Sequence, residues 1–145
     1  MPRNYVASYV HSDGIAGALV ELSVGDITSA KTAELQDLGR ELAMHITAMA
    51  PRVVNPSQLN IDEWNAELSR LSSSASIARL PPAERVEALR AARERYERDF
   101  CLLKQPFVKD ESLTVEDRIS RTAGALGERI EVLRFARFAS FDRPA

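Results

Sequence analysis

The spacing of apolar residues changes early in the chain, and this change restricts the fold more than any other feature. Residues 4–11, NYVASYVH, are rich in β-branched and aromatic side chains, which predicts a half-buried strand. Residues 12–14 offer turn chemistry, and residues 15–22 predict a second strand, so the simplest arrangement is a β-hairpin. From about residue 30 to residue 50 the apolar residues recur at helical spacing instead.

This predicted helix has one narrow apolar stripe, formed by Leu35, Leu38, Leu42, Ile46 and Met49. Thr28 and Ser29 are the expected N-cap residues, and Pro51 stops the helix. An amphipathic helix needs a surface for its apolar face, and the hairpin is the expected partner.

The middle of the chain predicts two more helices. Residues 62–71 read as a short helix that buries Trp64, whereas the serine-rich residues 72–76 give the weakest signal for regular structure. A longer helix is expected from Pro82 to about residue 100, since proline fits a first helical turn. Its expected apolar side consists of Val86, Leu89, Tyr96 and Phe100.

The end of the chain predicts a last helix and a third strand. Thr114 and Asp117 have the spacing of a capping box, and Gly127 suits the position just past a helix end. Residues 129–141 have strong strand character and are expected to join the hairpin. The predicted fold class is therefore α+β, a small three-stranded antiparallel sheet flanked by about four helices, in one domain spanning residues 1–145.

Composition excludes several kinds of function. Nineteen basic against 21 acidic residues give a net charge of −2, which argues against electrostatic nucleic-acid binding. No apolar run approaches the roughly 20 residues that a membrane span needs, and the N-terminus lacks a secretory signal. With a single cysteine, no internal disulfide can form, so we expect a reducing, cytoplasmic setting.

Motifs of catalysis and cofactor binding are missing. The sequence has no phosphate-binding glycine loop, no zinc-like spacing of Cys and His, and no nucleophile elbow. Cys101, between Phe100 and Leu102, is expected to be a small core residue. We therefore predict no catalytic residues, no metal and no cofactor, and an unrelated small enzyme is disfavoured.

Two residues of the first predicted helix have alternative interpretations. Met44 lies nearly opposite the apolar stripe, so either another helix covers it or it is an exposed anchor for a partner. His45 lies at the edge of the stripe, where a packed, hydrogen-bonded histidine is favoured over a ligand.

Four segments together resemble the core domain of bacterial elongation factor Ts, and their order and spacing match along nearly the whole chain. They are YVHSDGIAGALVEL, ELAMHITAMAP, LLKQPFVKD and RFARF. The resemblance implies a translation factor that binds elongation factor Tu and accelerates GDP release. It also implies a homodimer. The aromatic residues of the predicted strands favour the same interpretation, because an aromatic surface needs to be covered; they are Tyr5, Tyr9, Phe135 and Phe138.

The resemblance assigns roles to particular residues. The implied partner-binding positions are His11, Asp26, Ile27, Thr28, Ser29, Met44 and His45. The implied structural motif is Gln105, Pro106, Phe107 and Val108, in which Pro106 enforces an extended path and Phe107 is mainly a buried anchor.

The sequence departs from the family pattern in two places. Relatives begin with a small helical domain that binds elongation factor Tu, whereas here Met1 directly precedes the first strand, so that module is expected to be absent. The family's T-D-F-V signature, whose Phe approaches the nucleotide site, falls here on residues 26–29, Asp-Ile-Thr-Ser. With a one-residue slip, Asp26 stands for the acidic residue and Ile27 for a smaller wedge.

Two functions follow as hypotheses. The first is a protein that binds elongation factor Tu and promotes nucleotide exchange weakly, because the aromatic wedge is lost. The alternative is a non-exchanging paralogue that serves as a dimeric protein-interaction module.

Overall fold

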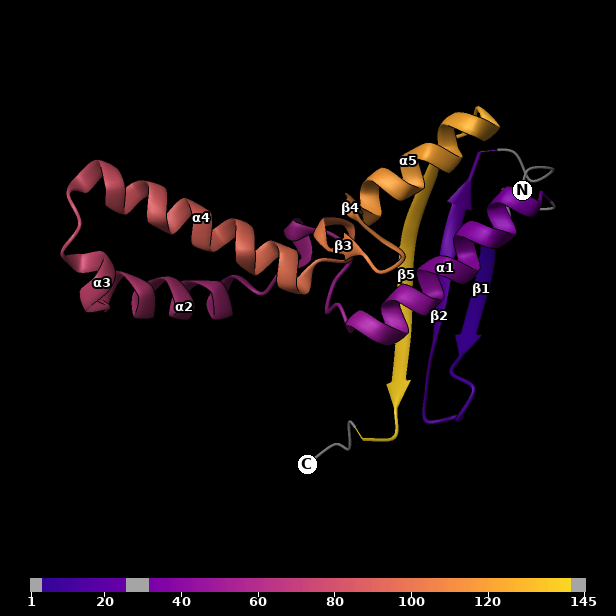
Figure 1. Cartoon of the computed structure of the whole chain (residues 1–145), viewed down its shortest axis with the longest axis horizontal. Helices are drawn as coiled ribbons and strands as arrows, with labels where there is room; N and C mark the ends of the chain where they lie inside the picture. The colour runs from indigo at the N-terminus through magenta and orange to yellow at the C-terminus, as the bar shows by residue number, and fades with distance from the viewer. Residues whose placement is uncertain (1–3, 26–31, 142–145) are drawn as a thin grey trace.

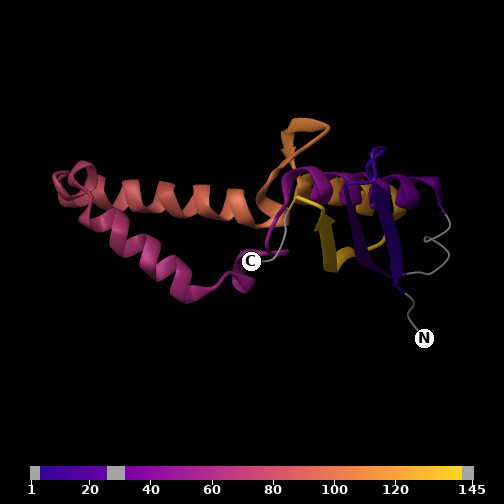
Figure 2. The ribbon, with the colours of Figure 1, turned by 90° about the horizontal axis from the view of Figure 1, so that it is seen from below.

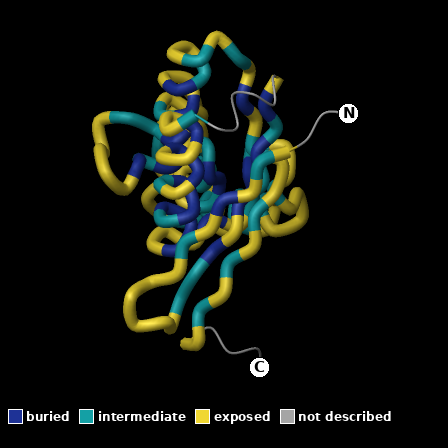
Figure 3. Tube along the Cα trace, turned by 90° about the vertical axis from the view of Figure 1, so that its right-hand side faces the viewer, coloured by how far each residue is buried: buried dark blue, intermediate teal, exposed yellow. Residues whose placement is uncertain are grey.

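The computed structural model describes residues 4–25 and 32–141 and confirms the α+β prediction. Strands β1 (Tyr5–Val10), β2 (Ala16–Val24) and β5 (Ile130–Ala139) form an antiparallel sheet in the order β1-β2-β5. Both the predicted hairpin and the third strand are present. Helices α1 (Ala33–Met49) and α5 (Val115–Leu126) lie together over one face of this sheet, and the buried residues lie between the two layers (Figures 1 and 3).

The core forms where the stripe of α1 meets the inward side of the sheet. Leu35, Leu38, Leu42 and Ile46 are fully buried with Leu22, as the stripe predicts. Met49 does not belong to the buried stripe, because it is the last residue of α1 and its side chain is 44% exposed.

Helix α1 starts later than the sequence suggested. The Oγ1 atom of Thr32 accepts a hydrogen bond from the backbone N–H of Leu35 at 3.3 Å, so Thr32 is the N-cap. The prediction of Thr28 or Ser29 at this position is wrong, since Thr32 offers the same hydroxyl chemistry directly before the first buried leucine. Thr28 and Ser29 themselves lie outside the described residues.

A helical arm extends away from the sheet (Figures 1 and 2). It consists of α2 (Ile61–Ser73), α3 (Ala75–Ala78) and α4 (Pro82–Phe100), and a 3-10 turn, η2 (Pro56–Gln58), precedes it. Residues 72–76, predicted as the least regular segment, are mostly helical and interrupted only at Ser74, so the described part has five α-helices where about four were expected. Val86, expected on the apolar side, is 68% exposed, because an arm that extends from the sheet buries little of α4, of which Ala92 is the buried residue.

Aromatic side chains hold the arm together near its root. The Tyr96 ring centroid is 5.0 Å from that of Trp64 and 4.8 Å from that of Phe100. The guanidinium of Arg93 lies over Trp64, and that of Arg52 over Phe100, which adds cation–π attraction.

The segment of residues 102–110 is not wholly extended. It starts as a 3-10 turn, η3 (Leu102–Lys104), and continues into β3 (Pro106–Phe107), which pairs with β4 (Asp110–Thr114). Gln105 has extended geometry, with φ −69° and ψ 143°, as its position before proline predicts. The small β3–β4 sheet was not foreseen.

Both predicted ends of α5 are confirmed. Thr114 and Asp117 exchange the two hydrogen bonds of a capping box, and Gly127 takes the left-handed conformation with φ 66°.

Candidate functional site

Met44 lies on the outer side of α1, between two hollows. Its side chain is half-buried, and α1 is the only described helix that lines either hollow, so no second helix covers it. The first hollow, of about 430 Å³, is shared with the hairpin tip and the end of β5. The second, of about 320 Å³, lies between α1 and the turn that carries Lys109. We call the residues around both hollows the Met44 surface. Besides Met44, the first hollow is lined by residues that include Tyr9, His11, Asp13, Arg137 and Phe141, and the second by Asp37, Arg40, Glu41 and Lys109.

His11 and Asp13 form the rim of the first hollow. The Nδ1 atom of His11 is 2.9 Å from Oδ1 of Asp13, and about half of each side chain is exposed. Asp13 also accepts a hydrogen bond from the backbone N–H of Ile15 at 3.0 Å. This backbone bond, with a smaller contribution from His11, lowers the pKa of Asp13 and keeps the carboxylate ionised. The hairpin turn thus presents a hydrogen-bonded pair of His11 and Asp13 to the same hollow as Met44.

Arg137 links the end of β5 to α1. Its Nε atom donates a hydrogen bond to the carbonyl oxygen of Thr47 at 3.1 Å, and its guanidinium lies 6.0 Å from the Phe141 ring centroid. Arg137 and Asp13 lie within the segments that resemble elongation factor Ts, but neither was predicted as a site residue. Alternation along β5 places Arg137 on the helix side, which is the only signal that was available.

An ion-pair network borders the second hollow. The carboxylate of Glu41 on α1 forms two ion pairs. It lies 3.3 Å from Nζ of Lys109 and 2.8 Å from a guanidinium nitrogen of Arg118 on α5. Since Glu41 and Arg118 are about four-fifths buried, this pair fixes α1 against α5 more firmly than an exposed pair would.

His45 is fully buried and does not reach the Met44 surface. Its Nε2 atom is 2.9 Å from Oε1 of Gln105, and its Nδ1 atom accepts the backbone N–H of Val108 at 3.1 Å. Phe107 stacks on the imidazole with the ring centroids 6.0 Å apart. His45 therefore packs as a hydrogen-bonded core residue, and any part it has in partner binding is indirect.

The structure brings some predicted site residues together and separates others. His11 and Met44 share the first hollow, while His45 lies with the structural motif, in which Gln105 and Phe107 are buried, Pro106 is half-buried and Val108 is 37% exposed. Asp26, Ile27, Thr28 and Ser29 lie outside the described residues, so their placement relative to Met44 stays a prediction.

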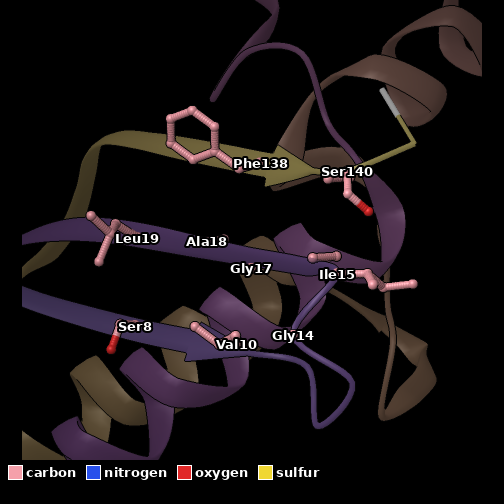
Figure 4. A pocket seen from close by; sticks show the side chains of 11 residues that line it. Ser8, Val10, Gly14, Ile15, Gly17, Ala18, Leu19, Phe138 and Ser140 are labelled. Carbon is pink, nitrogen blue, oxygen red and sulfur yellow. The ribbon is translucent and has the colours of Figure 1, made fainter. Parts of the chain in front are cut away.

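The outer face of the sheet carries a second apolar surface. Val6, Val10, Leu19 and Phe138 are all more than half exposed there. A hollow of about 520 Å³ lies beside Phe138 and Leu19 at the hairpin end (Figure 4). Tyr5, Tyr9 and Phe135 point to the other face and pack against the core, so of the four aromatics that suggested a dimer only Phe138 is on this side.

Other kinds of site find no support in the part of the chain that the structure describes. No three His, Cys, Asp or Glu side chains there gather as metal ligands. No helix within residues 4–25 or 32–141 is long and apolar enough to cross a membrane. Cys101 is fully buried, and burial raises the pKa of its thiol, as expected of a core cysteine.

Comparison with known proteins places the chain in a family. The family model described as elongation factor TS matches residues 2–142. An elongation factor Ts of Fervidobacterium nodosum is 36% identical over 137 residues, covering 91% of this chain and 67% of the relative. An elongation factor Ts of Koribacter versatilis is 34% identical over 135 residues, covering 92% and 61%. The chain thus spans about three-fifths to two-thirds of the length of these relatives. It belongs to the elongation factor Ts family.

Proposed function

We propose that this chain acts in translation elongation by binding elongation factor Tu, and that it promotes GDP release only weakly. The observation that carries the proposal is the family match over residues 2–142, together with the elongation factor Ts relatives at about one-third identity. Because the relatives extend beyond the matched part, the activity is a proposal for this chain.

The Met44 surface is the docking site in this proposal. A flexible thioether at its centre supplies adaptable apolar contact. Paired polar groups surround it, with His11 hydrogen-bonded to Asp13 on one side and the ion pair of Glu41 and Lys109 on the other. An apolar centre with a polar rim is the usual anatomy of a protein interface.

Weak exchange follows from the residues between β2 and α1. An exchange factor must bind the nucleotide-free partner more tightly than the GDP-bound partner. Contacts that are equally strong in both states add affinity but do not favour GDP release. The family's aromatic wedge is replaced by Ile27 or Thr28, according to the register. Docking contacts at Met44 are expected to remain while the contacts specific to the nucleotide-free state are reduced.

The test is a titration of elongation factor Tu loaded with fluorescent GDP, read for both binding and GDP release. We expect binding with little acceleration of release. Met44→Ala should weaken binding about 5- to 30-fold, the equivalent of about 1–2 kcal/mol for a central contact. Met49→Ala is the matched control, because this exposed methionine of the same helix lines neither hollow.

Three other outcomes are informative. Absence of binding would overturn the proposal and leave the protein-interaction module as the function. Strong acceleration that Ile27→Ala abolishes would show that this loop still reaches the nucleotide site. Equal weakening by Met44→Ala and Met49→Ala would move the docking site away from the Met44 surface.

A second candidate property is a homodimer formed through the outer face of the sheet. Val6, Val10, Leu19 and Phe138 cluster on this face, which no described helix covers. Apolar surface of this kind is favourable to bury against a second copy. The ion pair between Glu21 and Arg134, 3.1 Å apart on neighbouring strands, provides a polar border.

Phe138→Asp is expected to convert the dimer to a monomer, because a carboxylate would be desolvated at the centre of the contact. Light scattering at high micromolar concentration measures the mass directly. Val86→Asp, at another exposed apolar residue, on α4, should leave the mass unchanged. If the wild-type protein has the mass of a monomer under these conditions, the homodimer hypothesis is wrong.

A further inference from the structure

A chain of three hydrogen bonds connects the root of the arm to the β3–β4 turn through His45. The side-chain amide of Gln105 donates to the carbonyl oxygen of Asp99, in the last turn of α4, at 3.0 Å. Oε1 of Gln105 lies 2.9 Å from Nε2 of His45, and Nδ1 of His45 lies 3.1 Å from the backbone nitrogen of Val108. His45 and Gln105 are essentially inaccessible to solvent.

The partners determine the protonation state of His45. A backbone N–H can only donate, so Nδ1 must accept from Val108 and carries no hydrogen. The Gln105 amide uses its nitrogen on Asp99, which leaves its oxygen to accept the hydrogen on Nε2. The imidazole is therefore neutral, with its hydrogen on Nε2, and both of its nitrogens are satisfied.

The turn held by this bond forms one wall of the Met44 surface. Val108 is followed by Lys109, whose ammonium group pairs with Glu41 and lines the second hollow. The turn is thus held to α1 by the bond from Val108 to His45 and by the ion pair between Lys109 and Glu41, and the Phe107 ring that precedes it stacks on the same imidazole. The Lys109 side of this pair is half-exposed, and pairs near the surface contribute about 0–1 kcal/mol, so loss of the bond to His45 is expected to loosen the turn at Val108 and Lys109.

We propose that His45 is a proton-sensitive latch for the turn at Val108 and Lys109. When Nδ1 takes up a proton, it becomes an N–H that faces the N–H of Val108, and the acceptor of the bond is lost. The turn is then released from α1, and the second hollow of the Met44 surface loses its Lys109 wall. The latch itself needs no partner; its effect on docking rests on the function proposed above.

The groups that surround His45 oppose its protonation. Burial is the main influence and lowers the pKa of His45 below its ordinary value of 6.5, while the bond to Gln105 raises it by less. The charged groups on the neighbouring elements are Glu41 on α1, Lys109 at the turn and Arg118 on α5; both cations pair with the one carboxylate, which leaves a net positive charge that also disfavours a protonated imidazole. From the α4 side come the Asp99 carbonyl and the buried Cys101, whose thiol is kept neutral because burial raises its pKa.

The sign of the pH effect follows from this shift. The folded protein binds fewer protons at His45 than the open or unfolded chain does, so acid favours opening. The latch is complete above the ordinary histidine pKa and weakens as the pH falls below it. His11 is the chain's only other histidine, which makes the origin of any change between pH 7.5 and 5.5 straightforward to assign.

The experiment is amide hydrogen exchange and ¹⁵N NMR on the whole protein at pH 7.5 and pH 5.5. Protection of the Val108 amide, corrected for the intrinsic rate, should fall by up to about tenfold at the lower pH, because a histidine free of the fold is then roughly 90% protonated. His11→Gln should keep this response. His45→Asn should abolish it, since the amide oxygen can accept from Val108 and does not titrate.

The ring nitrogens of wild-type His45 give a second measurement that needs no variant. At pH 7.5 their ¹⁵N shifts should show hydrogen on Nε2 and none on Nδ1. Hydrogen on Nδ1, or a protonated ring at this pH, would overturn the latch. So would constant Val108 protection in the wild type, or an unchanged pH response in His45→Asn. Because elongation factor Tu is absent from these measurements, their outcome is independent of the proposed docking function.

Discussion

Replacing Phe107 with alanine is expected to lower the free energy of unfolding by about 3–5 kcal/mol, the range for removing a buried aromatic ring. Phe107 is 2% exposed and joins the core that α1 and α5 share. Its ring stacks on the imidazole of His45 with the ring centroids 6.0 Å apart, and the guanidinium carbon of Arg118 also lies 6.0 Å from the Phe107 centroid. Two strands as short as β3 and β4 cannot be stable alone, so this buried ring is a main contact that attaches them to the domain, beside the Val108–His45 bond and the Lys109–Glu41 pair.

Urea denaturation of Phe107→Ala measures this effect, with Phe141→Ala as the matched control. Phe141 is 64% exposed, and its truncation should change stability by no more than about 0.5 kcal/mol. Phe107→Leu should recover part of the loss, because it refills the cavity without restoring the stack on His45. Similar losses for Phe107→Ala and Phe141→Ala would contradict the anchoring role.

The elements predicted correctly are those whose signal is local. The alternation in residues 4–11, the stripe from Leu35 to Ile46 and the capping box at Thr114 each lie within one element or its cap. The resemblance to elongation factor Ts rested on segments of this kind, and the comparisons confirm it. The N-cap of α1 was predicted wrongly at Thr28 or Ser29, because Thr32 has the same hydroxyl chemistry and the choice of cap depends on where the helix begins to pack.

The features that were missed depend on contacts between distant segments. Arg137 meets Thr47 and Lys109 meets Glu41, pairs separated by 90 and 68 positions. Periodicity within one element contains no information on such pairs. The same is true of the buried face of α4, because Val86 becomes exposed or buried according to what packs beside the arm. The Met44 surface is built from pairs of this kind, so the sequence indicated Met44 and His11 but not their surroundings.

Two glycine-to-alanine substitutions should shift stability in opposite directions. Gly39 lies at the centre of α1, where a Cβ atom would come within 2.6 Å of Cβ of Ala7 and 2.9 Å of the Tyr5 ring. Cβ of Ala7 is attached to the backbone of β1 and cannot rotate away, so α1 would have to move off the sheet. Overpacking of this kind costs about 1–3 kcal/mol. A Cβ atom added at Gly124 in α5 would meet nothing within 4 Å, so only helix propensity changes there.

We therefore expect Gly39→Ala to lower the free energy of unfolding by about 1–3 kcal/mol. Gly124→Ala should raise it by about 1 kcal/mol. Thermal or urea denaturation of the two variants in parallel measures the difference, and each variant controls for the general effect of alanine in a helix. If both substitutions stabilised the protein, α1 could not lie as close to β1 as the geometry at Gly39 requires. The core between that helix and the hairpin, which positions Met44 on one side and His45 on the other, would then need a different packing.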